Sequence, residues 1–461
     1  MKTFGMNKPS IEGVPFHRRI SYSLTDTAGN LLYCVISSYL LYFYTDVFGL
    51  SITVAGALLF ATRFVDAVDS PVWGILIDHT KTKYGQSRPY FLWMCIPFAL
   101  FMVLTFTTPH VSYVEKIIYA AVTYVLAGIC YTGISTPITS ILPNLTPNSK
   151  ERVVLNSFRM VGGNVGFFVA TTFTLPLVSL FGGGNEQKGF SLTLLLFAII
   201  AVIMFLIAFL DMREVSSVRV KTIPIRESFV AMKRNWPWVL IVAANLCYWI
   251  GLNIRSATVI YYFQYNLDSK SWVPLINGLT SIQLVSMILI PFLVRKLRKN
   301  SVMILGFILA ALGQLIICVA HGQMPVIIAG WIVGALGSGF ACSMPFAMLS
   351  DAVDYGEWKN GVRASGFLTA IGSAFCLKAG SGIGGLLPAW VMGFYGYRAG
   401  HVQTASALYG IQFSFIWLPM IVFLLGILPM TIYKKFERNE QMIRGELVRG
   451  GHHTLLSAKE M

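Results

Sequence analysis

Long apolar segments constrain this chain more than any other feature of its sequence. Twelve stretches are mostly apolar, and about 20 such residues make a helix long enough to cross a bilayer. The stretches are 20–46, 52–77, 90–108, 114–142, 153–181, 189–210, 236–265, 272–294, 301–320, 324–350, 362–395 and 405–433. They are continuous, unlike the alternating segments of about 10 residues in a membrane β-barrel. We therefore expect an all-α membrane protein with twelve transmembrane helices.

The composition excludes a soluble protein. Charged residues make up only 12% of the 461 positions and hydrophobic residues 55%, whereas a soluble domain carries about 25% charged residues. No polar block is long enough to form a soluble nucleic-acid-binding domain. The net charge of +15 therefore needs another explanation than a nucleic-acid partner.

The basic residues explain that charge through the orientation of the chain. With the N-terminus in the cytoplasm, the cytoplasmic segments hold 27 of the 35 Lys and Arg residues, the external loops hold four, and four lie at membrane depth. This asymmetry is the positive-inside pattern, and it faces the basic residues toward the anionic inner leaflet. Both termini are expected in the cytoplasm.

A basic connection divides the apolar segments into six and six. We expect an N-terminal bundle at 1–210, a cytoplasmic linker at 211–235, a C-terminal bundle at 236–433 and a cytoplasmic tail at 434–461. The proline at 71 has a counterpart at 291, which indicates weak internal similarity. Two pseudo-symmetric six-helix bundles are typical of secondary transporters, whose site lies between the repeats near mid-membrane.

Other classes of protein fit the sequence less well. A membrane sugar sensor would need an output domain or a long tail, and neither is visible. An enzyme would need a nucleophile or a catalytic histidine, and no such constellation appears. Oligomerisation is not required for a site between two halves of one chain.

Three ionisable side chains interrupt the apolar segment 52–77. Arg63, Asp66 and Asp69 occur within seven residues, although a charge at bilayer depth costs roughly 2.5–3.5 kcal/mol on insertion scales. In a helix Arg63, Ser70 and Asp66 share a narrow face, with Asp69 at its edge. We interpret them as a site for a coupling cation. A fixed Arg–Asp pair that only joins helices is the alternative.

Other basic residues stand alone on apolar segments. Arg159, Arg255 and Lys378 lie on three different segments, and each is expected to face an aqueous cavity. With Arg63 they outnumber the interior acids, even with Asp26 counted, so the balance favours an anionic ligand that arginine can bind. The alternative is that each base snorkels or binds a backbone carbonyl.

Aromatic residues offer a second kind of sugar contact. Tyr33 and Tyr262 are candidates for stacking on a sugar ring, although most aromatic residues here fit interfacial belts and helix packing.

Charged stretches between apolar segments are candidates for an inner gate. The loop after 324–350 carries Asp351, Asp354, Glu357 and Arg363, and the loop after 52–77 carries the pair Asp78 and Arg88. Ion pairs of this kind can form in one state of a transporter and break in another. A well-capped, solvated turn is the alternative.

Four stretches resemble the glycoside–pentoside–hexuronide:cation symporter family of the major facilitator superfamily. They are YTDVFG at 44–49, the helical stretch 63–69, 74–89, and above all SDAVDYGEW at 350–358. The stretch 384–404 is most similar to the glucuronide permeases. The resemblance spans about residues 18–435 and implies the major facilitator fold, alternating access, and cation-coupled uptake of a glycoside across the bacterial inner membrane.

The resemblance also implies roles for single residues. Arg63 and Asp66 match the family's helical coupling motif, Ser70 stands where its second acid is usual, and Thr132 matches a threonine that helps to bind sodium. Positions that bind galactosides in the family are occupied here by Asn30, Ser135 and Thr139. The family's basic site residues match Arg159 and Lys378.

Together these features predict proton-coupled symport of a glycoside or an anionic sugar such as a hexuronide. The alternative is a sodium-coupled carrier of a neutral glycoside such as a xyloside. We expect no cofactor, and no metal beyond a possible sodium ion. The test is transport by Asp66→Asn, which should lose cation-driven accumulation.

Overall fold

The computed structural model describes residues 14–80, 82–146, 149–214, 232–360, 368–369 and 371–457. In this part of the chain the ordered structure is helical, apart from an isolated bridge between Thr82 and Gly85. Nine of its helices are long and apolar enough to span a membrane, and two shorter apolar helices cover Ile52–Thr62 and Pro89–Thr105. The all-α membrane class is therefore confirmed, while the count of twelve spans stays a prediction.

The N-terminal helices follow the expected segments closely. They are α1 (Phe16–Tyr42) with its π-helical end η1 (Phe43–Val47), α2 (Ile52–His79), α3 (Pro89–Thr105), α4 (Tyr113–Ser140), the short α5 (Leu142–Leu145), α6 (Ser149–Gly182) and α7 (Glu186–Asp211).

The C-terminal helices are more broken. They are α9 (Trp236–Tyr261) with η2 (Tyr262–Asn266), η3 (Lys270–Trp272), α10 (Val273–Leu279), η4 (Thr280–Ile282), α11 (Gln283–Val294), α12 (Lys299–Val319), α13 (Met324–Asn360), η5 (Ile371–Phe375), α15 (Cys376–Phe394), α16 (Ala405–Gln412), η6 (Phe413–Trp417) and α17 (Leu418–Ser457). The segment 272–294, expected as one helix, is interrupted by the 3-10 turn η4 between α10 and α11.

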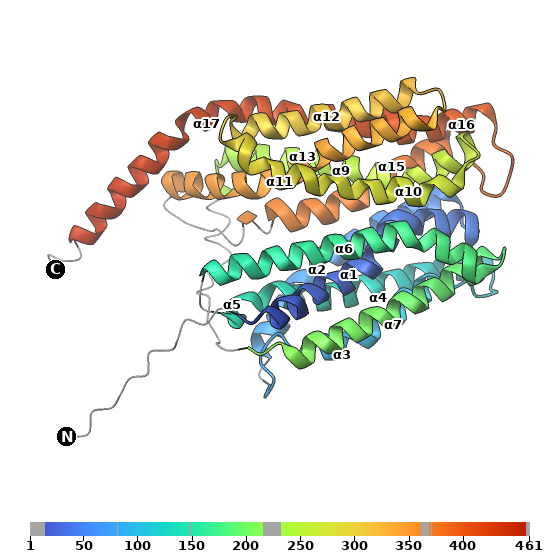
Figure 1. Cartoon of the computed structure of the whole chain (residues 1–461), viewed down its shortest axis with the longest axis horizontal. Helices are drawn as coiled ribbons and strands as arrows, with labels where there is room; N and C mark the ends of the chain where they lie inside the picture. Colours follow the sequence, from blue (N-terminus) through green and yellow to red (C-terminus); the bar gives the residue numbers. More distant parts are fainter. Residues whose placement is uncertain are drawn as a thin grey trace.

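Two expected helix ends are wrong. The segment 324–350 continues as α13 to Asn360, so Asp351, Asp354 and Glu357 lie on a helix and not in a loop. The segment 405–433 likewise continues as α17 to Ser457 and projects from the bundle (Figure 1). Hydropathy marks where the apolar face ends, but a helix ends only where its backbone hydrogen bonding is broken.

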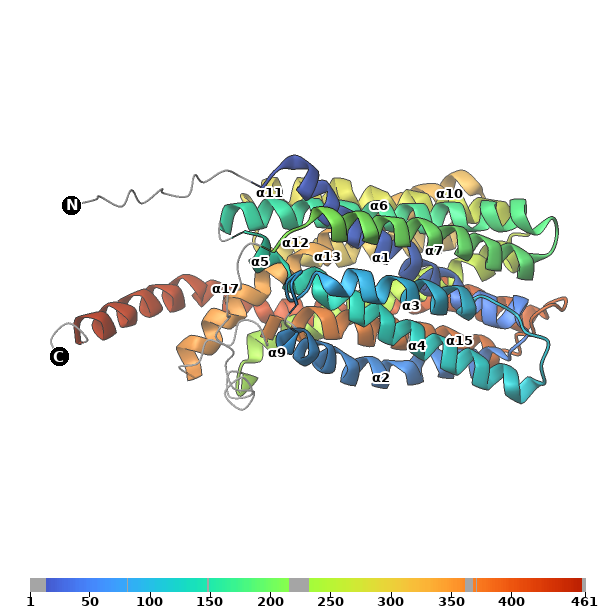
Figure 2. The ribbon, with the colours of Figure 1, turned by 90° about the horizontal axis from the view of Figure 1, so that it is seen from below.

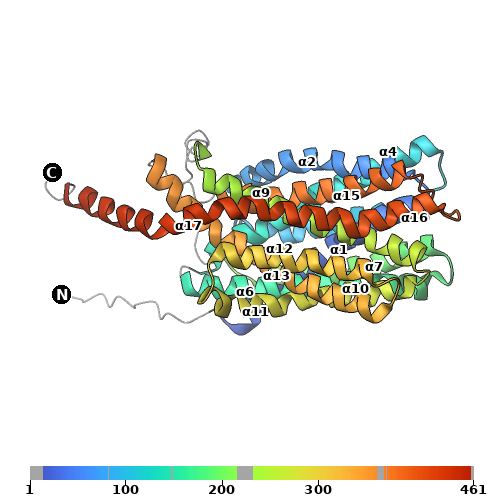
Figure 3. The same cartoon turned by 90° about the horizontal axis from the view of Figure 1, so that it is seen from above.

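The helices form two layers that coincide with the two sequence halves. α1 to α7 make one layer and α9 to α17 the other, as Figure 1 shows; the two layers overlap in Figure 2, which views the molecule from below. α1 begins, and α17 leaves the bundle, at the same end, which we call the proximal end; α1 finishes and α16 begins at the distal end (Figure 3).

Small residues let helices approach closely within each half. A Cβ at Gly166 of α6 would lie 2.4 Å from the main-chain oxygen of Thr27 on α1, and one at Gly313 of α12 would lie 2.5 Å from that of Gly330 on α13. In membrane proteins such contacts replace hydrophobic burial as the force that joins helices.

Three helix pairs form the seam between the halves: α2 packs on α15, α6 on α10, and α1 on α9. A Cβ at Gly56 of α2 would lie only 2.4 Å from Ala389 Cβ on α15. Toward the distal end, Thr45 Oγ1 lies 2.8 Å from the Tyr261 hydroxyl, and Asn277 donates to the Tyr39 hydroxyl at 2.8 Å. The seam is thus closed by packing and hydrogen bonds at its distal end.

Candidate functional site

The charged stretch of 63–70 lies on α2, where that helix faces α15 across the seam. Asp69 is 8% exposed, and Lys378 of α15 places its Nζ 3.6 Å from Asp69 Oδ1. The same ammonium donates to Thr132 Oγ1 of α4 at 3.4 Å. A carboxylate and a hydroxyl therefore hold a cationic group between the halves. The side chains of Arg63, Asp66 and Ser70 lie outside the described residues.

A small cavity of about 30 Å³ adjoins this cluster and is lined by Tyr33, Thr62, Tyr131, Thr132 and Lys378 among others. The rings of Tyr33 and Tyr131 stack on each other, with centroids 4.1 Å apart and an interplanar angle of 10°. The cavity has room for about one water molecule and none for a sugar. Tyr33, expected to contact substrate, thus lies beside Lys378, and Tyr131 is a neighbour that the sequence reasoning missed.

A second polar group lies between α1 and α6. A Cβ at Gly163 would lie 2.9 Å from Asp26 Oδ2 and 3.2 Å from Asn30 Nδ2, so the glycine leaves room for both side chains. Arg159, one turn before Gly163, interacts electrostatically with Asp26 and donates its Nε to Asn156 Oδ1 at 3.2 Å. The structure therefore brings Asp26, Asn30 and Arg159 together, as expected for residues of one site.

Two residues of α4 contact mainly their own helix. Ser135 is half-buried and donates to the main-chain oxygen of Thr132 at 3.4 Å. Thr139 is exposed and donates to that of Thr136 at 2.9 Å. They share a helix with Thr132, but their hydroxyls are directed to the backbone.

The expectation that Arg255 faces an aqueous cavity is wrong. Arg255 is 3% exposed, and its guanidinium carbon lies 3.7 Å from the ring centroid of Trp331 on α13. The residues of α9 that line a cavity in the seam are Asn253 and Ala257, two positions to either side and so about 160° around the helix. Arg255 therefore points into the C-terminal half, away from α1.

The side chain of Tyr262 also points into the C-terminal half, as that of Arg255 does. It is buried, and its ring stacks on that of Phe415 with centroids 4.6 Å apart. The structure thus separates these two candidates from Lys378 and Tyr33.

The one ion pair that the described residues show for a gate candidate lies within one half. Asp351 is 1% exposed and pairs with Lys299 of α12 at 2.6 Å. Trp358, next to Glu357, donates to Glu446 of α17. Arg363 and the side chain of Asp78 lie outside the described residues, and the role of this group as a gate stays a prediction.

Arg88 likewise ties helices of the N-terminal half together. Its Nε donates to the main-chain oxygen of Phe209 at 2.5 Å, and its guanidinium stacks over the Phe209 ring at 4.7 Å. In return Glu214, which the sequence reasoning missed, accepts the backbone N–H groups of Ser87 and Arg88, each at 2.8 Å. A carboxylate at a helix N-terminus is stabilised by the exposed N–H groups there.

Comparisons with known proteins agree with this architecture. A bacterial homolog of the human lysosomal transporter Spinster, in an inward-facing and unoccupied conformation, has a TM-score of 0.67 at 12% identity and covers 94% of this chain and 99% of that chain. A proton-dependent oligopeptide transporter structure has a TM-score of 0.66 at 14% identity, covering 92% and 99%. At such low identity these likenesses show the fold, which is that of major facilitator transporters.

Relatives in sequence include transporters of sugars and glycosides. The isoprimeverose transporter of Lactiplantibacillus pentosus is 44% identical over 427 residues, covering 91% of this chain and 89% of that protein. The putative glycoside/cation symporter YagG of Escherichia coli is 29% identical over 435 residues, covering 94% of each. A glucuronide carrier protein homolog of Escherichia coli is 28% identical, covering 91% and 93%.

The family model described as "MFS/sugar transport protein" matches residues 21–435. Its members and the structural neighbours are membrane transporters and not enzymes. The resemblance to glycoside:cation symporters is thereby confirmed, and this chain belongs to the MFS/sugar transport protein family.

Proposed function

We propose that this chain is a cation-coupled importer of a neutral glycoside that works by alternating access. The observation that carries the proposal is Lys378, whose ammonium lies between Asp69 and Thr132 and so connects the two halves. Proton or sodium binding at the acids of α2 would replace the ammonium and free α15 from α2. Coupling then follows, because the seam can rearrange only when the acids have another cation.

The charges of the described residues favour a neutral sugar over an anionic one. Lys378 has Asp69 as its counter-charge, Arg159 has Asp26 nearby, and Arg255 is stacked on Trp331 away from the cavities of the seam. The positive excess that favoured a hexuronide is therefore largely compensated. The similarity to an isoprimeverose transporter supports the same choice.

The residues proposed for each role follow from these positions. Arg63, Asp66, Asp69, Ser70 and Thr132 make the coupling site, with Lys378 as its internal cation. The sugar would lie between this cluster and the group of Asp26, Asn30 and Arg159, against the stacked tyrosines 33 and 131. The cavity there is too small for a sugar in the present state, so the site has to form as the seam opens.

The proton is the coupling ion that we propose, because Ser70 removes one of the two acids with which the family binds sodium. The protein lies in the bacterial inner membrane with its proximal end in the cytoplasm, in agreement with the excess of basic residues there.

Uptake into proteoliposomes tests the function. An inward proton gradient should drive accumulation of radiolabelled isoprimeverose, and unlabelled isoprimeverose should compete better than phenyl glucuronide. Accumulation driven by a sodium gradient alone would show that sodium, and not the proton, is the coupling ion. Stronger competition by the glucuronide would show that the substrate is an anionic sugar. If neither sugar shows saturable uptake, glycoside import is refuted.

A further inference from the structure

Asp46 carries a carboxylate that belongs neither to the proposed coupling site nor to the proposed sugar site. It belongs to the YTDVFG stretch at 44–49 and lies on η1, at the distal end of α1. It is half-buried, between two surface cavities of about 480 and 590 Å³ that meet the seam at this end. The role of this carboxylate therefore has to be inferred from the groups that contact it.

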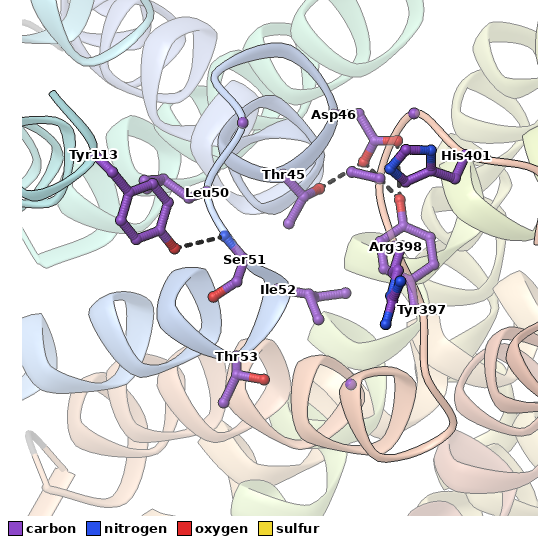
Figure 4. A pocket seen from close by; sticks show the side chains of 14 residues that line it. Thr45, Asp46, Leu50, Ser51, Ile52, Thr53, Tyr113, Tyr397, Arg398 and His401 are labelled. Carbon is purple, nitrogen blue, oxygen red and sulfur yellow. Dashed lines mark hydrogen bonds between the residues drawn. The ribbon is translucent and has the colours of Figure 1, made fainter. Parts of the chain in front are cut away.

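Hydroxyl groups from both halves converge on this carboxylate. The Tyr397 hydroxyl lies 2.9 Å from Asp46 Oδ1 and 2.8 Å from Oδ2, and Tyr265 donates to Oδ1. Thr45 donates to Oδ2 at 2.6 Å. Tyr265 is on η2 and Tyr397 in the connection after α15, so two of the three donors reach Asp46 across the seam. Figure 4 shows Asp46 and Tyr397 side by side in the smaller of these two cavities, whose lining also includes Thr45, Arg398 and His401.

The chemistry of the group fixes the direction of each hydrogen bond. Each of these hydroxyls donates and the carboxylate oxygens accept, which is the arrangement that an ionised carboxylate requires. Burial raises the pKa of the Tyr397 hydroxyl, with Tyr261 and Asp46 acting in the same direction, so this hydroxyl keeps its proton. Hydrogen bonds to a charged acceptor are about twice as strong as neutral ones.

Charged groups surround Asp46 at some distance. Lys270 of η3 acts on it electrostatically but forms its ion pair with Glu186 of α7. Arg398 and His401 line the same cavity from the connection after α15. The contacts described for the carboxylate itself come from hydroxyl groups, which water can replace when the halves separate.

We propose that Asp46 is the latch of the distal gate, a positioning residue that holds the outer side closed through Tyr265 and Tyr397. Weakening the latch shifts the transporter toward an outward-open state. The proposal rests on the proposed function only in placing the distal end outside the cell. It is tested without any sugar, so its failure can be told from a failure of the proposed substrate.

The test follows access to the seam from outside. Ser37 lies nine residues before Asp46 on α1, about 13 Å along the helix, and lines a small cavity in the seam with Asn253 and Ser381. The variant Ser37→Cys is reconstituted in right-side-out vesicles and labelled with a membrane-impermeant maleimide, and label on the native cysteines of the parent is subtracted. Adding Tyr397→Phe or Asp46→Asn should raise the labelling rate about tenfold, as a loss of ~1.4 kcal/mol from the closed state would.

Tyr113→Phe is the matched control. Tyr113 lines the same cavity as Tyr397, but its hydroxyl accepts from the backbone N–H of Ser51 at 3.2 Å within the N-terminal half. It should leave the labelling rate unchanged. The proposal is refuted if the labelling rates of Tyr265→Phe and Tyr397→Phe do not exceed the rate of this control variant.

A transport assay separates gating from simple damage. With the outer gate weakened, external sugar should bind several-fold more tightly while the maximal rate falls, because closure has become slower. A lowered melting temperature with unchanged labelling and unchanged apparent affinity would assign Asp46 a structural role only. Should Asp46→Asn fail to fold, the two Tyr→Phe variants decide the question alone.

Discussion

The two halves of this protein place their interior charges differently. In the N-terminal half, Asp26 and Arg159 lie near each other, and Asp69 lies on the face of α2 that meets the seam. The C-terminal half contributes Lys378 to the seam but holds Arg255 inside its own bundle against Trp331. Two basic residues that look equivalent in the sequence therefore have different surroundings: Lys378 lies in the seam beside Asp69 and Thr132, and Arg255 is buried within one half.

The sharpest test of this difference is Lys378→Gln. Removing the ammonium leaves the buried Asp69 without the cation described here, and breaking a buried pair costs about 3–5 kcal/mol. We expect cation-driven accumulation to fall at least about 100-fold, the free energy of unfolding to drop, and the double variant Lys378→Gln/Asp69→Asn to recover stability but not coupling. Gradient-driven uptake and thermal unfolding measure both. Normal accumulation by Lys378→Gln would show that Lys378, like Arg255, is not needed for coupling.

Thr132→Val should have the next largest effect, because it removes the hydroxyl that accepts from Lys378. We expect roughly tenfold weaker coupling, the size of one hydrogen bond to a charged group. Thr123→Val is the matched control. Thr123 is buried on the same helix and donates to the backbone of Tyr119 at 2.8 Å, as Thr132 donates to Gly128 at 3.1 Å. Equal losses in the two variants, measured as the accumulation ratio at a fixed gradient, would show that only the helix was disturbed.

Arg255→Gln should act on stability rather than on coupling. A desolvated cation–π contact contributes ~2 kcal/mol, so the melting temperature should fall by several degrees while the accumulation ratio stays within about twofold. Trp331→Phe, which keeps a ring beneath the guanidinium, should lose less stability. A large fall in the accumulation ratio at an unchanged melting temperature would instead indicate that Arg255 belongs to the transport site.

Arg88→Lys should have the smallest effect. Lysine keeps the charge but cannot reproduce the planar contact with the Phe209 ring and the bonds to the end of α7. We expect a loss of about 1 kcal/mol in stability and near-normal uptake, since this tie lies within one half. A large loss of uptake at unchanged stability would instead support Arg88 as part of a gate that acts between the halves.

Much of the fold followed from the sequence because hydropathy is a local property. The helices at α3, α4 and α9 begin and end within a few residues of the expected segments. The ends of α13 and α17 did not follow, since a polar helix can continue past the membrane. The sequence also selected Asp69 and Lys378, because a charged residue in an apolar segment has to be explained. Thr132 was indicated only by the family resemblance.

The partners of those residues could not be predicted. The sequence predicts Lys378 as a substrate ligand, yet its ammonium contacts Asp69 and Thr132, which are more than 200 positions away in the chain. Arg255 was placed at a cavity, although that face of α9 is turned inward. The sequence shows Asp46 only as part of a family motif, because nothing local indicates that Tyr265 and Tyr397 approach it.

The sequence by itself determined that this protein is a helical membrane transporter in two halves, and which polar side chains its interior must accommodate. The tertiary structure decided which of them meet. Membership in an apolar segment depends on the residues of that segment alone. A pair across the seam depends on how the helices are placed, and small residues such as Gly56 and Gly166 allow close contacts between distant parts of the chain.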